Sequence, residues 1–357
     1  MTRSRKHSTP SPAWPHARRA LWAAFFATVT WLVVDQARQI EWAQVFDAVR
    51  RIPASNLAIA AVLAATSYGV YSSFDLLGRR WTGHRLGAAR VLAVTFVSYA
   101  FNLNFGALVG GLAFRYRLYA RLGLENGVIA RVVGLSLVTN WLGYVVLAGA
   151  VFASGSIAPP ESFSIGQLPL RALGVALLAV AAAYLAACAW STRRDFSLRG
   201  HAFTLPPLRM ALAQLLRSIV NWLAVAALLY TLLQQALPFQ TVLGIFLVAA
   251  IAGVVAHVPA GLGVIEAVFI ALAGAEVPRN DLLGALLAYR ALYYLAPLAI
   301  AIATYLVLEG RTRSGSRAGR RPGHAACTQG VARSGAGRDG GSRSREHEDC
   351  LFDGRTQ

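Results

Sequence analysis

Two charged residues, one acid and one base, stand in apolar sequence where neither has a polar neighbourhood. Glu266 follows the break HVPAGLG, and Arg290 lies in the next apolar run, LLGALLAYRALYYLAP. Ionisable side chains at membrane depth are costly and usually face a partner or a substrate path. A broken helix is tolerated at that depth only inside protein or against a wet cavity, because its backbone groups need partners. The sequence therefore predicts a membrane protein with a polar interior.

An ion pair between Glu266 and Arg290 would make both charges tolerable, because each would neutralise the other. Tyr289 precedes Arg290, and Tyr293 and Tyr294 follow it by three and four positions, which predicts an aromatic and guanidinium surface on one helix. We predict that Glu266, Tyr289 and Arg290 contact a substrate. Two roles remain open for the pair: it holds two helices together, or it opens and closes as a cavity changes face.

Two breaks in apolar sequence predict hinges or re-entrant elements. The first interrupts the stretch Val91 to Phe114, and the second precedes Glu266. The residues that make these breaks are small or helix-disfavouring: Asn102, Asn104, Gly106, Gly110 and Gly111 in the first, and Pro259, Gly261 and Gly263 in the second.

A basic cluster follows the first break. Arg115, Arg117 and Arg121 lie within a few residues, and the last two share a helix face. Cationic donors beside a broken helix would suit a lipid phosphate, because free backbone amides add to the charge. The alternative is a cluster that extends its charges to the cytoplasmic interface. Arg115, nearest the break, is expected to face inward and to bind substrate.

Composition excludes an ordinary soluble domain. Of 357 residues, 56% are hydrophobic and 14% are charged, whereas about a quarter are charged in soluble domains. Apolar runs of about 20 residues, each long enough to span a bilayer, recur from Ala20 to Leu308. The fold class is predicted to be all-α, a polytopic helical membrane protein with no large soluble domain.

The net charge of +18 comes almost entirely from arginine. In a membrane protein such an excess indicates cytoplasmic loops and tails. Because these residues are dispersed between spans, nucleic acid is the weaker interpretation. The cysteines (Cys188, Cys327 and Cys350) lack metal-ligand spacing, and no phosphate loop, zinc motif or Ser/His/Asp arrangement is present. We therefore expect no metal, no cofactor and no catalytic residue, and the protein is predicted not to be an enzyme.

The lengths of the apolar runs predict the membrane spans. A separate amphipathic segment, Ile40 to Arg51, predicts a helix on the membrane surface. Its expected apolar face consists of Ile40, Ala43, Val45 or Phe46, and Val49. The expected spans are residues 20–36, 56–77, 127–153, 170–190, 208–237, 242–256, a short segment 264–274, and 282–308.

Loop charge predicts the topology. If Val91 to Phe114 crossed fully, the basic segments 115–121 and 193–199 would both lie outside, against the positive-inside rule. If the stretch enters and returns, both fall inside, as does the basic loop 79–90. Residues 261–275 must then cross as a short tilted helix. This arrangement gives about eight crossings plus one re-entrant element, with both termini cytoplasmic.

This predicted topology divides the chain into three regions. Residues 1–19 are a basic, disordered N-terminus, residues 20–308 form the transmembrane domain, and residues 309–357 are a disordered cytoplasmic tail rich in Arg, Gly and Ser.

The chain resembles the transmembrane, flippase-like region of bacterial lysylphosphatidylglycerol synthases and the stand-alone inner-membrane proteins of the same fold. Three segments carry the resemblance: Asn102 to Leu124, Pro259 to Phe269 and Ala285 to Leu298. It implies a helical bundle with re-entrant elements and movement of a lipid between leaflets. By motif it assigns functional positions to Arg115, Pro259, Gly261, Gly263, Glu266, Tyr289 and Arg290.

Two departures from the family pattern bear on function. Many relatives have an acid just before the arginine of the first motif, whereas residues 107–113 contain none here. A proton-coupled or cation-recognising role for that element is therefore in doubt. Full-length synthases also carry a soluble aminoacyl-transferase domain after the bundle, whereas only the Arg/Gly/Ser-rich segment follows here, so lysyl transfer is not expected.

Three hypotheses follow. The first is translocation of a membrane phospholipid or lipid-linked substrate, with Arg115 and Arg290 holding its phosphate and Glu266 pairing with Arg290 when the site is empty. The second is an accessory or scaffold subunit of cell-envelope lipid synthesis, although the sequence names no protein partner. The third is a membrane-embedded lipid-modifying enzyme with Glu266 as acid and base. It needs a second carboxylate, and Asp75, near the end of the expected span 56–77, is the acid considered for that role.

Overall fold

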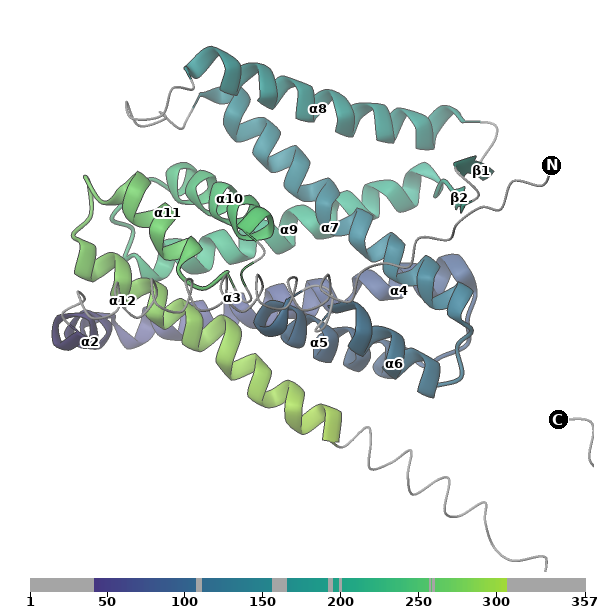
Figure 1. Ribbon diagram of the computed structural model, residues 1–357, viewed down its shortest axis with the longest axis horizontal. Helices are drawn as coiled ribbons and strands as arrows, with labels where there is room; N and C mark the ends of the chain where they lie inside the picture. Colours follow the sequence, from purple (N-terminus) through teal and green to yellow (C-terminus); the bar gives the residue numbers. More distant parts are fainter. Residues whose placement is uncertain are drawn as a thin grey trace, which may run out of the picture. The chain divides into compact units, whose positions relative to one another are not determined.

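The protein is all-α in a computed structural model that describes residues 42–106, 111–155, 166–191, 195–198, 201–256, 258 and 261–306 (Figure 1). The exception among these residues is a two-stranded antiparallel ribbon, β1 (Asp195–Leu198) paired with β2 (His201–Thr204), between two long helices. The interactions below belong to the compact unit Met1–Tyr305. The expected first span, the N-terminus and the tail lie outside the described residues.

Six helical stretches in the described part are long and apolar enough to cross a bilayer. They are Ala54–Thr82, Asn126–Ser154 (α7), Gln167–Trp190 (α8), Leu208–Leu232 (α9), Phe239–Ala256 (α10) and Arg279–Leu306. The helix α11 (Val264–Ala273) has 10 residues and is too short for a straight crossing. The prediction of an all-α polytopic membrane protein is confirmed, with six spans in the described residues against about eight expected in the whole chain.

Most boundaries agree with the expected spans, and two differ for local reasons. α9 ends at Leu232 rather than Leu237, because Gln234 and Gln235 take left-handed φ values of 51° and 63°. The first span in the described part consists of α3 (Ala54–Ser72) and α4 (Phe74–Thr82), joined at Ser73. It continues five residues past the expected end at Leu77, so Asp75 lies inside the helical stretch.

The stretch Val91 to Phe114 folds back on itself as predicted (Figure 1). α5 (Ala88–Phe105) ends where Gly106 takes a φ of 86°, and α6 (Phe114–Arg121) returns beside it. Phe101 of α5 stacks on Phe114 of α6 with ring centroids 4.3 Å apart. Gly111 permits this return, since a Cβ atom there would lie 2.8 Å from the Asn102 side-chain oxygen.

The amphipathic helix is present as α2 (Trp42–Arg51), but its expected apolar face is partly wrong. Val45 and Ala48 are buried, whereas Ala43 is exposed and Phe46 is 53% exposed. The buried side packs on α12 (Arg279–Tyr289), where a Cβ atom on Gly284 would lie 2.8 Å from that of Ala48. α2 is therefore a packed part of the bundle, lying against α12 (Figure 1).

Polar side chains join the central helices, as expected for a membrane interior where helix association depends on packing and hydrogen bonds. Ser67 of α3 donates to Asn221 of α9 at 2.8 Å, and Tyr144 of α7 donates to the Leu247 carbonyl of α10 at 3.0 Å. Both bonds are buried. They fix α3, α7, α9 and α10 as a frame on which α11 and α12 are held.

Candidate functional site

Glu266 is positioned by the joint between α10 and α11. Gly261 and Gly263 take left-handed φ values of 57° and 78°, a conformation that glycine adopts at little cost. α11 begins at Val264, so Glu266 lies in its first turn, where the positive end of the helix dipole favours an acid. Gly261 and Gly263 thus form the predicted break. Pro259 and Gly110, predicted as hinge residues, lie outside the described residues.

Arg290 is positioned by an irregularity in the last span. α12 ends at Tyr289, and Arg290–Leu295 form a π-helical turn (η3) before the α-helix resumes. Such turns insert a residue into a helix and are frequent at functional sites. Here the turn places Arg290, Tyr293 and Tyr294 on the inner side of the span.

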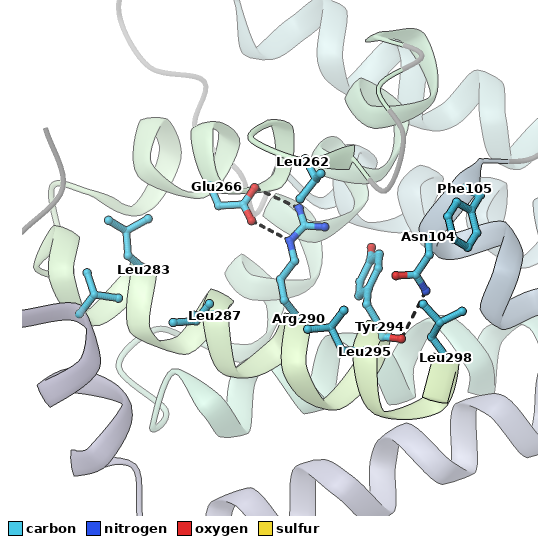
Figure 2. Close-up of a pocket in the computed structure, with 11 residues that line it drawn as sticks. Asn104, Phe105, Leu262, Glu266, Leu283, Leu287, Arg290, Tyr294, Leu295 and Leu298 are labelled. Atoms are coloured by element: carbon cyan, nitrogen blue, oxygen red, sulfur yellow. Dashed lines mark hydrogen bonds and ion pairs between the residues drawn. The ribbon is translucent and has the colours of Figure 1, made fainter. Parts of the chain in front are cut away.

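Arg290 and Glu266 form the predicted ion pair (Figure 2). Arg290 Nε donates to Glu266 Oε1 at 2.9 Å, and Nη2 donates to Oε2 at 3.1 Å. Nη2 also donates to the Gly261 carbonyl at 2.9 Å, which satisfies one backbone group of the break. Two parallel bonds to one carboxylate give this pair its strength and orientation.

The pair borders a cavity of about 560 Å³ with mostly apolar walls. In Figure 2 Arg290, Glu266 and Asn104 form its polar part, and leucine side chains from α12 and the helix beyond it lie around them. Phe105, Leu262 and Leu295 line the cavity and are each more than half exposed. An apolar chamber with one cationic group suits an amphiphile with a negative headgroup.

Tyr294 and Asn104 complete the polar side of the cavity. Tyr294 lies with its ring centroid 5.0 Å from the Arg290 guanidinium carbon, within the range of a cation–π contact. Asn104 donates to the Tyr294 carbonyl at 3.3 Å, a carbonyl in the π-helical turn. Asn104 was predicted as a hinge residue. The structure shows that it also lines the cavity, which the sequence did not predict.

Tyr289 lies behind the cavity and is not among its lining residues. It is 2% exposed and stacks on Tyr293, with ring centroids 5.5 Å apart. The Tyr293 hydroxyl lies 2.7 Å from that of Ser67 and 2.9 Å from that of Tyr99. These tyrosines form a buried layer that holds the π-helical turn, and direct contact of Tyr289 with a substrate in this cavity does not fit its position.

Arg115 faces inward as predicted, but it lies in a second site. Its Nε lies 3.2 Å from Asp75 Oδ2, and the same oxygen accepts hydrogen bonds from Thr95 at 2.9 Å and Tyr119 at 2.7 Å. Arg115 does not line the cavity. The acid absent from residues 107–113 is thus supplied by α4, a partner that sequence reasoning missed although Asp75 lies in a predicted span.

The location of Asp75 also bears on the enzyme hypothesis. Its three partners belong to α5 and α6, and Glu266 is the one carboxylate among the described residues that line the cavity. The described residues hold no group of three His, Cys, Asp or Glu side chains placed to bind a metal ion. Among the residues that the structure describes, no second carboxylate lines the cavity beside Glu266.

Comparisons with known proteins place this arrangement in a family. Residues 20–301 match the family described as the lysylphosphatidylglycerol synthase TM region. The chain is 43% identical over 307 residues to inner membrane protein YbhN of Escherichia coli, covering 86% of this chain and 96% of that protein. It is 28% identical over 309 residues to the uncharacterized protein slr0712 of Synechocystis sp., covering 85% of this chain and 96% of that one.

A more distant similarity reaches a named enzyme. The chain is 24% identical over 287 residues to a phosphatidylglycerol lysyltransferase of Staphylococcus haemolyticus, covering 78% of this chain and 32% of the enzyme. The family match, the relatives and the six apolar helices together make the chain a multi-pass membrane protein. It belongs to the family of the lysylphosphatidylglycerol synthase transmembrane region.

Proposed function

We propose that this protein moves an anionic phospholipid, or a lipid-linked substrate with a phosphate, between the leaflets of the bacterial inner membrane. The observation that carries the proposal is the bidentate Arg290–Glu266 pair on the wall of a largely apolar cavity. On this wall Arg290 would contact the anionic headgroup, and the leucine side chains would contact an acyl chain. The substrate class follows from this combination of a positive group and apolar surface.

A lipid headgroup meets its largest barrier in the hydrocarbon core, where an unpaired charge is costly. Arg290 lowers that barrier by offering the phosphate a bidentate partner of the kind the carboxylate now occupies. Glu266 keeps the guanidinium paired when no lipid is bound, which avoids a buried unpaired cation. In this mechanism the lipid phosphate replaces the carboxylate of Glu266 at Arg290, and Glu266 returns when the lipid leaves.

The break and the π-helical turn supply the movement that such an exchange requires. Arg290 is bonded to Glu266 in α11 and to the Gly261 carbonyl in the joint before it, so loss of these bonds to an incoming phosphate frees α11 at the two left-handed glycines. Tyr293, in the π-helical turn, is hydrogen-bonded through its hydroxyl to Ser67 and Tyr99. We assign α11 and its glycine joint as the moving part and the tyrosine layer as the fixed part.

The relatives narrow the substrate class. One is named an inner membrane protein and another a phosphatidylglycerol lysyltransferase. Phosphatidylglycerol is accordingly the first lipid to test. We retain the arrangement with both termini cytoplasmic, with residues 20–308 as the membrane domain and residues 309–357 as a cytoplasmic tail. No lysyl transfer is proposed.

Arg115 is not assigned to the phosphate of the moving lipid. It is held by Asp75 away from the lining of the cavity, and an acid on a neighbouring helix makes it an anchor for the re-entrant hairpin α5–α6. The phosphate-binding role is given to Arg290 alone.

Leaflet exchange in proteoliposomes tests the proposal. Headgroup-labelled fluorescent phosphatidylglycerol is reduced from outside with dithionite. Wild-type protein should allow quenching beyond the outer-leaflet half, and Arg290→Ala should restrict it to that half. Arg279→Ala is the matched control, because Arg279 begins the same span and is exposed. Full quenching by a well-inserted Arg290→Ala protein, or none by the wild type, contradicts the proposal.

A scaffold role is the competing function, and the completeness of the ion pair favours it as the second candidate. Arg290 makes two bonds to the Glu266 carboxylate and one to the Gly261 carbonyl, which is the number that a purely structural pair would use to join α11 to the last span. Replacing a buried pair by apolar residues is often neutral for stability. The double variant Glu266→Leu with Arg290→Leu should therefore fold. It separates the candidates, since a scaffold keeps its cellular function and a translocator loses it.

A further inference from the structure

A second cavity, of about 370 Å³, lies between α4 and α9 and shares no lining residue with the first. Its walls come from the last turns of α4 and from the start of α9. The lining residues are Leu77, Arg80, Trp81, Pro207, Arg209, Met210 and Ala213. Two of them are basic and none is acidic.

Both arginines are available to a ligand. Arg80 and Arg209 are exposed, and no hydrogen bond or ion pair joins either to another described residue. Arg209 also lies in the first turn of α9, where its charge adds to the positive end of the helix dipole. An anion at this place offsets both sources of positive potential, and phosphate is the group that arginine pairs match best.

An apolar track leads from this basic pocket along α9. Leu208, Leu212, Leu216 and Val220 recur every four residues and are 37–65% exposed, so they form one line on a helix long enough to span the bilayer. The neighbouring line on the same helix holds Arg209 and Ala213, which line the cavity. A charged headgroup position and a hydrocarbon track therefore lie side by side.

Trp81 fixes the depth of the pocket. It is half-buried in the last turn of α4, which ends at Thr82, and Gly83 follows with a φ of 71°. Tryptophan is enriched at the level of lipid headgroups, because its ring is apolar and its N–H is polar. The position of Trp81 therefore favours a pocket at the depth of the lipid phosphates.

We propose that this pocket binds one anionic phospholipid, with its phosphate between Arg80 and Arg209 and one acyl chain along the track Leu208 to Val220. The two arginines would also recognise the phosphate of a free phosphate ion. The exposed apolar residues beside them favour a lipid, because a free ion has no acyl chain to bury there. The site is separate from the translocation cavity, so it binds lipid whether or not the protein moves lipid.

Trp81 makes the site measurable by fluorescence. The full-length protein is placed in phosphatidylcholine nanodiscs that contain either brominated phosphatidylglycerol or brominated phosphatidylcholine. The chain has 8 tryptophans, so the quenching measured with Trp81→Phe is subtracted from that of the wild type. The difference is the quenching of Trp81 alone. The wild type should prefer phosphatidylglycerol. Arg80→Gln or Arg209→Gln should lower that preference about fivefold, and the double variant about 30-fold.

Matched controls separate the site from its rivals. Arg85→Gln with Arg90→Gln removes the same charge from exposed residues outside the pocket and should leave the preference unchanged. Inorganic phosphate should compete no better than chloride at equal ionic strength. Equal quenching from both lipids, or a preference that survives Arg80→Gln with Arg209→Gln, would overturn the proposal. So would a control variant that loses the preference for phosphatidylglycerol to the same extent. Specific competition from phosphate would also overturn it and would assign the pocket to the free ion.

Discussion

Two arginine–acid pairs stand in the interior of this protein, and their surroundings differ. The Arg290–Glu266 pair borders a cavity, and its side chains are 11% and 23% exposed. The Arg115–Asp75 pair is 7% and 0% exposed and lies among Thr95 and Tyr119. The first pair has room beside it for a ligand, whereas the second is enclosed by protein. The two pairs therefore differ in whether a ligand could lie beside them.

The two pairs are connected by tyrosine rings. The Arg115 guanidinium carbon lies 5.9 Å from the Tyr71 ring centroid, and Tyr71 stacks on Tyr99 at 3.6 Å. The Tyr99 hydroxyl reaches that of Tyr293, which belongs to the same π-helical turn as Arg290. A series of tyrosine contacts thus links the two pairs.

The largest effect is expected at the enclosed pair. Asp75→Leu leaves Arg115 buried without its partner and should lower the free energy of unfolding by about 3–5 kcal/mol. Asp75→Leu with Arg115→Leu should regain most of that loss, because no charge is left unpaired. Unfolding in mixed micelles of dodecyl maltoside and dodecyl sulfate measures both. Equal stability of the single and double variants would show that the pair is not an anchor.

At the cavity pair, the effect should fall on transport rather than on stability. Arg290→Lys keeps the charge but loses the planar fork that makes two parallel bonds. Lipid exchange should slow by about tenfold or more, which corresponds to at least one bond of about 1.4 kcal/mol. The unfolding free energy should change less than in Asp75→Leu. A lysine variant that transports at the wild-type rate would remove the bidentate geometry from the mechanism.

The tyrosine layer should show an intermediate effect. Tyr293→Phe removes the hydroxyl that meets both Ser67 and Tyr99, and leaves buried polar groups with fewer partners. The loss of unfolding free energy should be about 1–3 kcal/mol. Tyr184→Phe is the control, because its hydroxyl bonds Gln214 in a partly buried place away from the layer. If the control loses as much stability as Tyr293→Phe, the layer has no special role as the fixed part.

The smallest effect should come from a single hydroxyl bond to the carboxylate of the enclosed pair. The Thr95 hydroxyl also lies 2.9 Å from the Val91 carbonyl of its own helix, so Thr95→Val should cost about 1.5 kcal/mol, the low end for a bond to a charged group. Thr304→Val is the matched substitution on an exposed helix face, where the hydroxyl bonds the Ile300 carbonyl of its own helix. Its unfolding free energy should stay near that of the wild type. The difference between the two valine variants measures what one partner adds to the enclosed pair.

The sequence by itself determined six membrane spans of the described residues, apart from their exact ends, and the cavity pair. The span expected at residues 127–153 is α7 at Asn126–Ser154, because a run of apolar residues long enough to cross a bilayer leaves the backbone no alternative to a helix. Glu266 and Arg290 could be paired from sequence, because an isolated acid and an isolated base in neighbouring apolar segments each need a partner. The fold-back at Asn102 to Gly111 followed from loop charge and from glycine.

Only the tertiary structure decided which groups share a site. Arg115 follows a break much like the one before Glu266, yet it binds Asp75 from a helix whose charge pattern pointed to a cytoplasmic end. Tyr289 precedes the π-helical turn and Tyr294 lies within it, yet only Tyr294 lines the cavity. Sequence spacing fixes which side chains share a helix face, but the contact between faces depends on helix rotation and depth, which are set by packing against neighbouring helices.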